Sequence, residues 1–295
     1  MGDEVRPVIV NGPDDPSPPP SRGVLDIATS PQPTSYPDIN TLLLELVSSV
    51  RTILRNRFIG MYLHGSLAIG DFRPDRSDID FLVVTDGELS DGLVAALYEI
   101  HARIAAGDSP WAKELEGSYI PRDALRRYDP ANARHPHIEQ GGSLRVEQHD
   151  SDWVVQRHVL REHGVTLAGP PLHSLIDPIG PDALRRALVE LTRSWWAPMV
   201  NDPTRLLRRG YQAYAVLTMG RILYTLEHGT VVSKPVAARW ARQALGQRWS
   251  ALIDRALAGP GDDDGDALDD EAVKETQRFI QYASEQCRRW SPNRA

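Results

Sequence analysis

Two aspartates in this sequence have the residue type and spacing of a metal site. Asp78 and Asp80 lead into the apolar run 79–85, a short segment next to turn-forming residues and therefore a predicted β-strand. Because strand side chains alternate between two faces, both carboxylates lie on the same face. They repel each other, and burying them unpaired is costly. A hard divalent cation removes this conflict, and oxygen ligands favour Mg²⁺, which takes further ligands from water and substrate phosphates.

A Gly-Ser pair nearby supplies groups that suit a phosphate. Gly65 and Ser66 follow a second short apolar run, 58–63, which is also a predicted strand. Glycine lets the backbone approach a phosphate closely, the Ser66 hydroxyl can donate to it, and the chain after Ser66 can open a short helix whose N–H groups face an anion. The alternative is a hairpin with a polar turn and two solvated aspartates, which leaves carboxylates leading into an apolar strand unexplained.

A third carboxylate comes from the segment 115–120, a predicted strand that stops at Pro121. Glu114 and Glu116 share one face of this segment by the same alternation. If this strand neighbours the strand that carries the aspartates, one glutamate completes a cluster that can bind metal or take a proton from an attacking hydroxyl. We favour Glu116, because it lies within the strand. The alternative is a solvated glutamate pair at a sheet edge.

Composition limits the classes of partner. The 295 residues are enough for two domains and carry a formal net charge of −7. The acidic stretch 262–271 accounts for this charge, so the remainder lacks the basic excess that long nucleic acid requires. No apolar run is long enough to span a membrane, the N-terminus is unlike a secretory signal, and the single Cys287 suits a reducing environment. We therefore expect a cytoplasmic protein that binds neither membrane nor long nucleic acid.

Three parts of the chain differ in composition. Residues 1–36 are rich in Pro, Ser and Asp, which predicts a disordered leader. Residues 37–170 combine the strands with amphipathic helices and predict an α/β (α+β) domain, whereas residues 171–295 show only helical patterns. Helices are expected at 38–55, 93–107, 152–163, 182–196, 203–227, 234–245, 247–257 and 271–290.

The interval 128–152 is polar and turn-rich, apart from a short strand expected near 144–146. His135, His137 and Glu139 could be imagined as a zinc site. The proline between the histidines and the lack of further ligands at suitable spacing favour a surface loop instead.

The Gly-Ser and Asp-x-Asp elements together resemble the signature of the nucleotidyltransferase superfamily. From about residue 39 to 290 the chain resembles the aminoglycoside 3''-adenylyltransferase family, in HGS with SDID, in HVLREHGVTLAGP and in LTMGRILYTLEHGTVVSKPVAARWA. This resemblance implies a small mixed sheet flanked by helices, followed by an all-helical C-terminal domain. It also implies an Mg²⁺-dependent enzyme that transfers AMP from ATP to a hydroxyl of a small molecule and releases pyrophosphate. The sequence does not give the oligomeric state, and we favour a monomer.

The same resemblance assigns roles to individual residues. Arg221 and Lys234 correspond to triphosphate ligands that the helical domain donates, and Glu116 corresponds to the family's catalytic glutamate. Both cations could instead be ordinary solvated or ion-paired residues. The alternative function is a regulatory or antitoxin-like module that acts on a protein partner or only binds nucleotide. Retention of all three carboxylates and of the helical half favours the enzyme.

The predicted acceptor half departs from the family pattern. The positions where the resistance enzymes carry acidic or histidine groups are occupied here by Leu207, Tyr211 and Tyr214. The aromatic residue with which those enzymes contact the antibiotic has no clear equivalent in this sequence, and Leu144 is the nearest position. The helical spacing continues through Thr218 and Arg221 to Thr225, so we expect one stripe, either lining an acceptor pocket or packed in the core. A wall of this kind has no carboxylate for a guanidinium group, and we therefore expect weak or absent modification of streptomycin.

Overall fold

The computed structural model describes residues 32–139, 141, 144–259 and 270–290. Most of the predicted leader, and residues 262–269 of the acidic stretch, lie outside them. Thr34 and Tyr36 already contact the folded part, because the Thr34 N–H donates to Asn40 Oδ1 at 3.1 Å and the Tyr36 ring lies 4.9 Å from the ring of Phe72. These contacts begin before the predicted leader ends.

A six-stranded mixed sheet forms the N-terminal half, in the order β5-β4-β3-β2-β1-β6. Strands β2 and β3 are parallel, and the other neighbours are antiparallel. The strands are β1 (Phe58–Leu63), β2 (Ile79–Thr85), β3 (Leu115–Pro121), β4 (Arg134–Ile138), β5 (Arg145–Gln148) and β6 (Val165–Ala168). The three strands predicted to carry or precede the site are confirmed, and β5 lies close to the short strand expected near 144–146.

Two strands were not predicted from the sequence. Strand β4 reads RHPHI, a polar and proline-containing sequence that does not have a strand pattern, yet it pairs with β3 on one side and β5 on the other. The expectation of a surface loop at His135 and His137 is therefore wrong: His135 is fully buried. Strand β6 is only four residues long and pairs with β1 at the other edge of the sheet. Its pairing depends on residues about 100 positions earlier, which a local pattern does not reveal.

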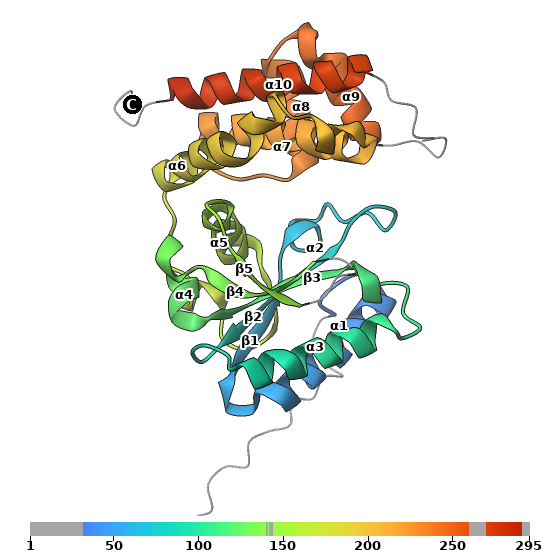
Figure 1. Ribbon diagram of the computed structural model, residues 1–295, viewed down its shortest axis with the longest axis vertical. Helices are drawn as coiled ribbons and strands as arrows, with labels where there is room; N and C mark the ends of the chain where they lie inside the picture. Colours follow the sequence, from blue (N-terminus) through green and yellow to red (C-terminus); the bar gives the residue numbers. More distant parts are fainter. Residues whose placement is uncertain (1–31, 140, 142–143, 260–269, 291–295) are drawn as a thin grey trace, which may run out of the picture. The chain divides into compact units, whose positions relative to one another are not determined.

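Helices cover both faces of the sheet (Figure 1). Helices α1 (Pro37–Leu54) and α3 (Asp91–Ala105) lie side by side on one face, where Leu43, Leu46 and Ile100 pack with Phe81 of β2. Helix α5 (Asp152–His163) lies on the other face, and Leu160 packs there with Leu82. Burial of apolar side chains on both faces explains why β2 reads as a nearly continuous apolar run. The short helices are α2 (Gly65–Ile69) and α4 (Arg122–Arg126), with 3₁₀ turns at Arg55–Arg57, Ala112–Glu114, Pro130–Asn132 and Leu172–Ser174.

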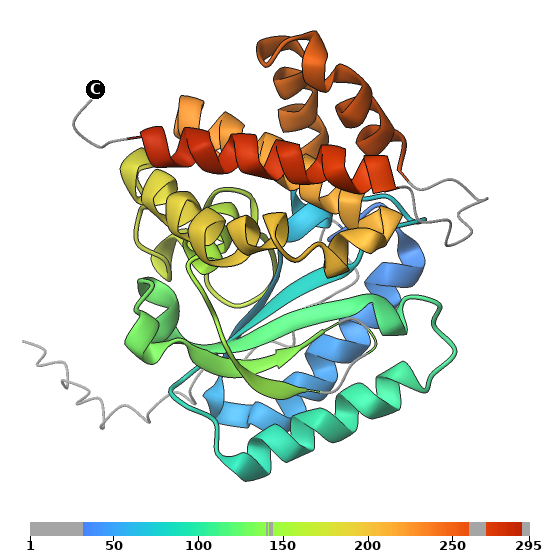
Figure 2. The same ribbon diagram turned by 45° about the horizontal axis from the view of Figure 1, so that its top comes forward.

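The second half is helical and has a core of its own (Figure 2). Its helices are α6 (Pro181–Leu191), α7 (Arg209–His228), α8 (Lys234–Ala244), α9 (Ser250–Ala258) and α10 (Asp270–Arg289). Trp196, Met219 and Phe279 are buried together in this core. None of the described helices is both long and apolar enough to cross a bilayer.

Three expected helices have different bounds in the structure. The segment 182–196 divides into α6 and a π-helical turn at Thr192–Trp196, which continues as a 3₁₀ turn at Ala197–Val200. The segment 203–227 opens with a 3₁₀ turn, Thr204–Leu207, so α7 begins only at Arg209. The segment 247–257 opens with the 3₁₀ turn Gln247–Trp249.

Candidate active site

The three predicted carboxylates lie on neighbouring strands. Asp80 of β2 and Glu116 of β3 are register partners across the parallel pair, and Asp78 directly precedes β2. Glu114 lies in the preceding 3₁₀ turn, so the strand position belongs to Glu116, as expected. Burial raises the pKa of Asp80, and burial together with repulsion from the other carboxylates raises the pKa of Asp78 to about 6 and that of Glu116 to about 8. A bound cation would counteract both causes.

The loop between β1 and β2 is shaped around Asp80. Gly65 has a φ of +60°, and a Cβ atom at this position would lie 1.7 Å from Asp80 Oδ2. The glycine therefore leaves the space that this carboxylate fills. Ser66 Oγ and both ring nitrogens of His64 are buried without a hydrogen-bond partner among the described residues. Burial lowers the pKa of His64 to about 4, so the imidazole is neutral. Unpartnered polar atoms beside the carboxylates fit the predicted role of Ser66 as a phosphate donor.

Two cations from the helical half face the carboxylates. Arg221 lies on α7, and Lys234 is the first residue of α8. Burial, reinforced by the charge of Arg221, lowers the pKa of Lys234 to about 8, although Asp78, Asp80 and Glu116 act in the opposite direction. Burial also lowers the pKa of Arg221. An anion bound near both cations would relieve their repulsion, which fits the predicted triphosphate contacts.

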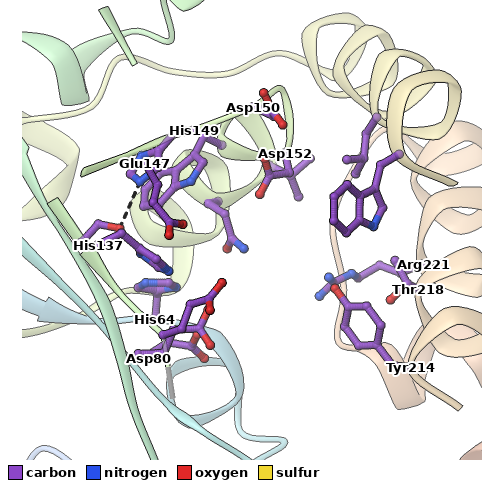
Figure 3. Close-up of a pocket in the computed structure, with 18 of the residues that line it drawn as sticks. His64, Asp80, His137, Glu147, His149, Asp150, Asp152, Tyr214, Thr218 and Arg221 are labelled. Carbon is purple, nitrogen blue, oxygen red and sulfur yellow. Dashed lines mark hydrogen bonds between the residues drawn. The ribbon is translucent and has the colours of Figure 1, made fainter. Parts of the chain in front are cut away.

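A cavity of about 600 Å³ separates these groups (Figure 3). Asp80 and His64 lie on one side, and the Arg221 side chain extends toward them from the other side, next to Tyr214. The predicted residues that line the cavity are Asp78, Asp80, Glu116, Tyr211, Tyr214, Thr218, Arg221 and Thr225. Gly65, Ser66 and Lys234 are not part of this lining; Lys234 contacts it through Tyr214, whose ring centroid is 4.4 Å from Nζ.

The predicted stripe is confirmed from Tyr211 onward, but not at Leu207. Because α7 begins only at Arg209, Leu207 lies in the preceding 3₁₀ turn and is 46% exposed. Tyr211 packs against the helical core and also lines the cavity, so the pocket and core interpretations both hold for it. The rings of Tyr211 and Tyr214 are 5.5 Å apart, and the Tyr214 ring is 5.8 Å from that of buried Trp196.

The cavity wall opposite α7 is acidic, contrary to the expectation from the α7 stripe. Glu147 of β5, Asp150 and Asp152 at the start of α5 also line the cavity, from the sheet half (Figure 3). Burial and the neighbouring Asp150 raise the pKa of Asp152 to about 6. The premise that this pocket lacks a carboxylate for a guanidinium group is therefore wrong. The stripe predicted from α7 describes only one wall, and no pattern on that helix could reveal the other.

Two histidines missed as cavity residues lie beside Glu116. Ser118, two residues further along β3, has its Oγ 2.8 Å from His137 Nδ1 and 3.3 Å from His149 Nε2. The His149 ring stacks on Trp153 with a centroid distance of 4.1 Å, and burial lowers the pKa of both histidines. No signal in the sequence marks this position, because β4 is polar and contains a proline and His149 lies outside the strands. Within the described part of the chain, no group of three His, Cys, Asp or Glu side chains converges in a way that could hold a metal ion.

The lack of a converging group of three ligand side chains among the described residues limits how Mg²⁺ can be held. Three carboxylates do not form a ready-made cage among the described residues. Asp78 and Asp80 fit the usual magnesium pattern of one or two protein carboxylates completed by water and substrate phosphates. Burial raises the pKa of both carboxyls, and a bound cation would offset the cost of burying their charge.

Both halves of the chain match known protein families. Residues 47–127 match the nucleotidyltransferase domain, and residues 174–286 match the aminoglycoside adenylyltransferase C-terminal domain. The chain belongs to the aminoglycoside adenylyltransferase family. The first match covers β1, β2 and β3 together with the three carboxylates, and the second covers the helices that carry Arg221 and Lys234.

Relatives and a solved structure agree with this assignment. An aminoglycoside (3'') (9) adenylyltransferase of Escherichia coli is 26% identical over 254 residues, which cover 83% of this chain and 93% of the relative. A spectinomycin 9-adenylyltransferase of Campylobacter jejuni is 26% identical over 257 residues, covering 82% and 93%. The spectinomycin adenyltransferase AAD(9) of Enterococcus faecialis, solved with ATP and spectinomycin, has the same fold, with a TM-score of 0.66 at 18% identity over 84% of this chain and 99% of that one.

Proposed function

We propose that this protein transfers AMP from ATP to a hydroxyl group of a cationic small molecule. The observation that carries the proposal is the cavity itself, in which Asp80 and Glu116 face Arg221 across a space that is also lined by tyrosines and acids. The acceptor oxygen bonds to the α-phosphorus, the bond to the β-phosphate oxygen breaks, and pyrophosphate leaves. Glu116 accepts the proton of the hydroxyl.

The remaining residues bind and orient. Asp78 and Asp80 would hold Mg²⁺, which supplies positive charge to the triphosphate. Ser66, Arg221 and Lys234 bind the phosphates through charge-assisted hydrogen bonds. Tyr211 and Tyr214 contact the acceptor on the α7 side.

The acidic wall narrows the class of acceptor. Glu147, Asp150 and Asp152 lie on the cavity wall opposite α7, and Asp152 is partly buried at the start of α5 without an ion-pair partner among the described residues. A cationic group on the acceptor would complete this wall. The names of the relatives point to aminoglycosides and spectinomycin, which carry hydroxyl and amino groups. Streptomycin is therefore a candidate acceptor again, and the expectation that it is excluded loses its physical basis.

We further infer a cytoplasmic monomer, in keeping with the use of ATP and with a single, buried cysteine. The chain should divide functionally near residue 170, with the catalytic carboxylates before this point and the triphosphate cations after it. The relatives are named as adenylyltransferases, and they give no support to the alternative of a regulatory or antitoxin-like module.

Pyrophosphate release tests the proposal directly. Purified protein is incubated with ATP and Mg²⁺ and with spectinomycin, streptomycin, other aminoglycosides or an uncharged polyol. We expect release with at least one cationic acceptor and none with the polyol. Asp80→Asn keeps the side-chain shape but removes the charge, so the folded variant should lose this release. Protein that binds ATP but releases no pyrophosphate with any acceptor would contradict the proposed reaction.

A further inference from the structure

Tyr214 contacts two parts of the site at once. The ammonium of Lys234 lies 4.4 Å from its ring centroid, and the same ring lines the cavity beside Arg221 (Figure 3). We propose that Tyr214 is a positioning residue for Lys234, holding its ammonium available to the triphosphate and away from the carboxylates. This inference rests on the proposed role of Lys234 as a phosphate ligand.

Several groups disfavour the position that Lys234 occupies. Lys234 opens α8, where Ser233 Oγ accepts from Val236 N–H at 3.4 Å, and a cation at a helix N-terminus is unfavourable. The charge of Arg221 adds repulsion. Within the described part of the chain Lys234 forms no ion pair, so the ring face of Tyr214 is its compensating contact.

The carboxylates offer Lys234 a competing position. Asp78, Asp80 and Glu116 all attract its charge. A lysine side chain has a flexible four-carbon stem and turns readily toward such partners. An ammonium paired with these carboxylates would neutralise the groups that bind the metal and would no longer be free for phosphate. A ring that holds the ammonium by its face, without a full negative charge, keeps both sets of groups available for ATP.

The ring is held firmly enough to do this. Tyr214 packs at 5.8 Å from Trp196, which is only 1% exposed in the helical core, and at 5.5 Å from Tyr211. Tyr214 itself remains 43% exposed, so its substitution does not open a buried core. The aromatic cluster therefore fixes the ring from the core side, while its remaining surface faces Lys234 and the cavity.

Calorimetric titration of the full chain with ATP and Mg²⁺, without acceptor, tests the proposal. Tyr214→Leu should weaken ATP binding about fivefold to thirtyfold, the range that a partly desolvated cation–π contact supplies. Tyr214→Phe keeps the ring and should stay within about threefold of the parent protein. Tyr98→Leu is the matched control, because Tyr98 is also 43% exposed but lies on α3, outside the cavity. Tyr214→Met replaces Tyr214→Leu if the latter does not fold.

A double-mutant cycle separates positioning from other roles. In a Lys234→Met background, Tyr214→Leu should change ATP affinity by less than about twofold. An equal loss in both backgrounds, or no loss in the parent background, would overturn the proposal. These titrations contain no acceptor. A failure to find any substrate would therefore contradict the proposed function, but the effect of Tyr214 on ATP binding could still be measured. With an acceptor in hand, Tyr214→Leu should raise the KM for ATP more than it lowers kcat.

Discussion

Replacement of Gly65 by alanine should remove activity while leaving the protein folded. The added Cβ atom would lie 1.7 Å from Asp80 Oδ2 and 2.5 Å from its Cγ, distances that non-bonded atoms do not adopt. The carboxylate must move by more than 1 Å to reach even a tight contact of 3.0 Å. A misplacement of about 1 Å can cost about 100-fold in rate. We therefore expect Gly65→Ala to release pyrophosphate at least about 100-fold more slowly.

A second glycine provides the matched control. Gly70 ends α2 with a φ of +77°, close to the +60° of Gly65, but a Cβ there meets nothing within 4 Å. Both substitutions place alanine in a left-handed conformation, which costs about 1–2 kcal/mol of stability. Only Gly65→Ala adds the collision with Asp80. Gly70→Ala should therefore melt a few degrees lower, roughly 2–6 °C, and keep most of its turnover.

Three measurements decide the comparison: circular dichroism melting, calorimetric titration with ATP and Mg²⁺, and pyrophosphate release with an accepted substrate. A folded Gly65→Ala protein that turns over within a few fold of the parent would refute the argument that this glycine makes room for Asp80. If Gly70→Ala loses as much activity as Gly65→Ala, backbone strain would be the cause, and the contact with the carboxylate would be irrelevant.

Three further outcomes follow from the site. Glu116→Gln should still bind ATP and Mg²⁺ by calorimetry but turn over at least about 100-fold more slowly, the scale of general-base loss; lost nucleotide binding would make it a metal ligand. Arg221→Ala should weaken ATP binding by about 1.5–3 kcal/mol through a lost charge-assisted contact, and unchanged affinity would disprove its phosphate role. The folded-state pKa of Asp152, about 6, lies above its ordinary 3.8, so the folded protein binds this proton more tightly and stability falls as pH rises from about 4 to about 6. Asp152→Asn should therefore be more stable than the parent at pH 7 by about 1–2 kcal/mol and equally stable at pH 4 in thermal melts, and a less stable variant at pH 7 would contradict the raised pKa.

The catalytic half could be predicted because its signals are local. The apolar runs of β1 and β2 and the alternation of Asp78 and Asp80 need no knowledge of the rest of the fold. The position of Glu116 needed one tertiary assumption, that β3 neighbours β2, which the register confirms.

The acceptor half could not be predicted because its signals are spread over the fold. Strand β4 carries His135 and His137 inward, so buried polar residues replace the apolar alternation that marks a strand. In the sequence, Asp150 and Asp152 lie at the start of a helix and show no sign of a pocket. They form a cavity wall only in the folded protein, where residues of α7 line the same cavity. The early start expected for α7 misplaced Leu207, since helical spacing continues through a 3₁₀ turn without a change in sequence pattern.

The position of the site within the sheet bears on how such an enzyme can acquire new substrates. Asp80 and Glu116 lie on β2 and β3, strands with neighbours on both sides and apolar layers on both faces. The acidic wall belongs to the edge strand β5 and to the residues at the start of α5, outside these central strands. Mutations in this wall would thus change which molecule is accepted without loosening the strands that we propose carry out the transfer, so selection by a new drug could alter specificity in single steps.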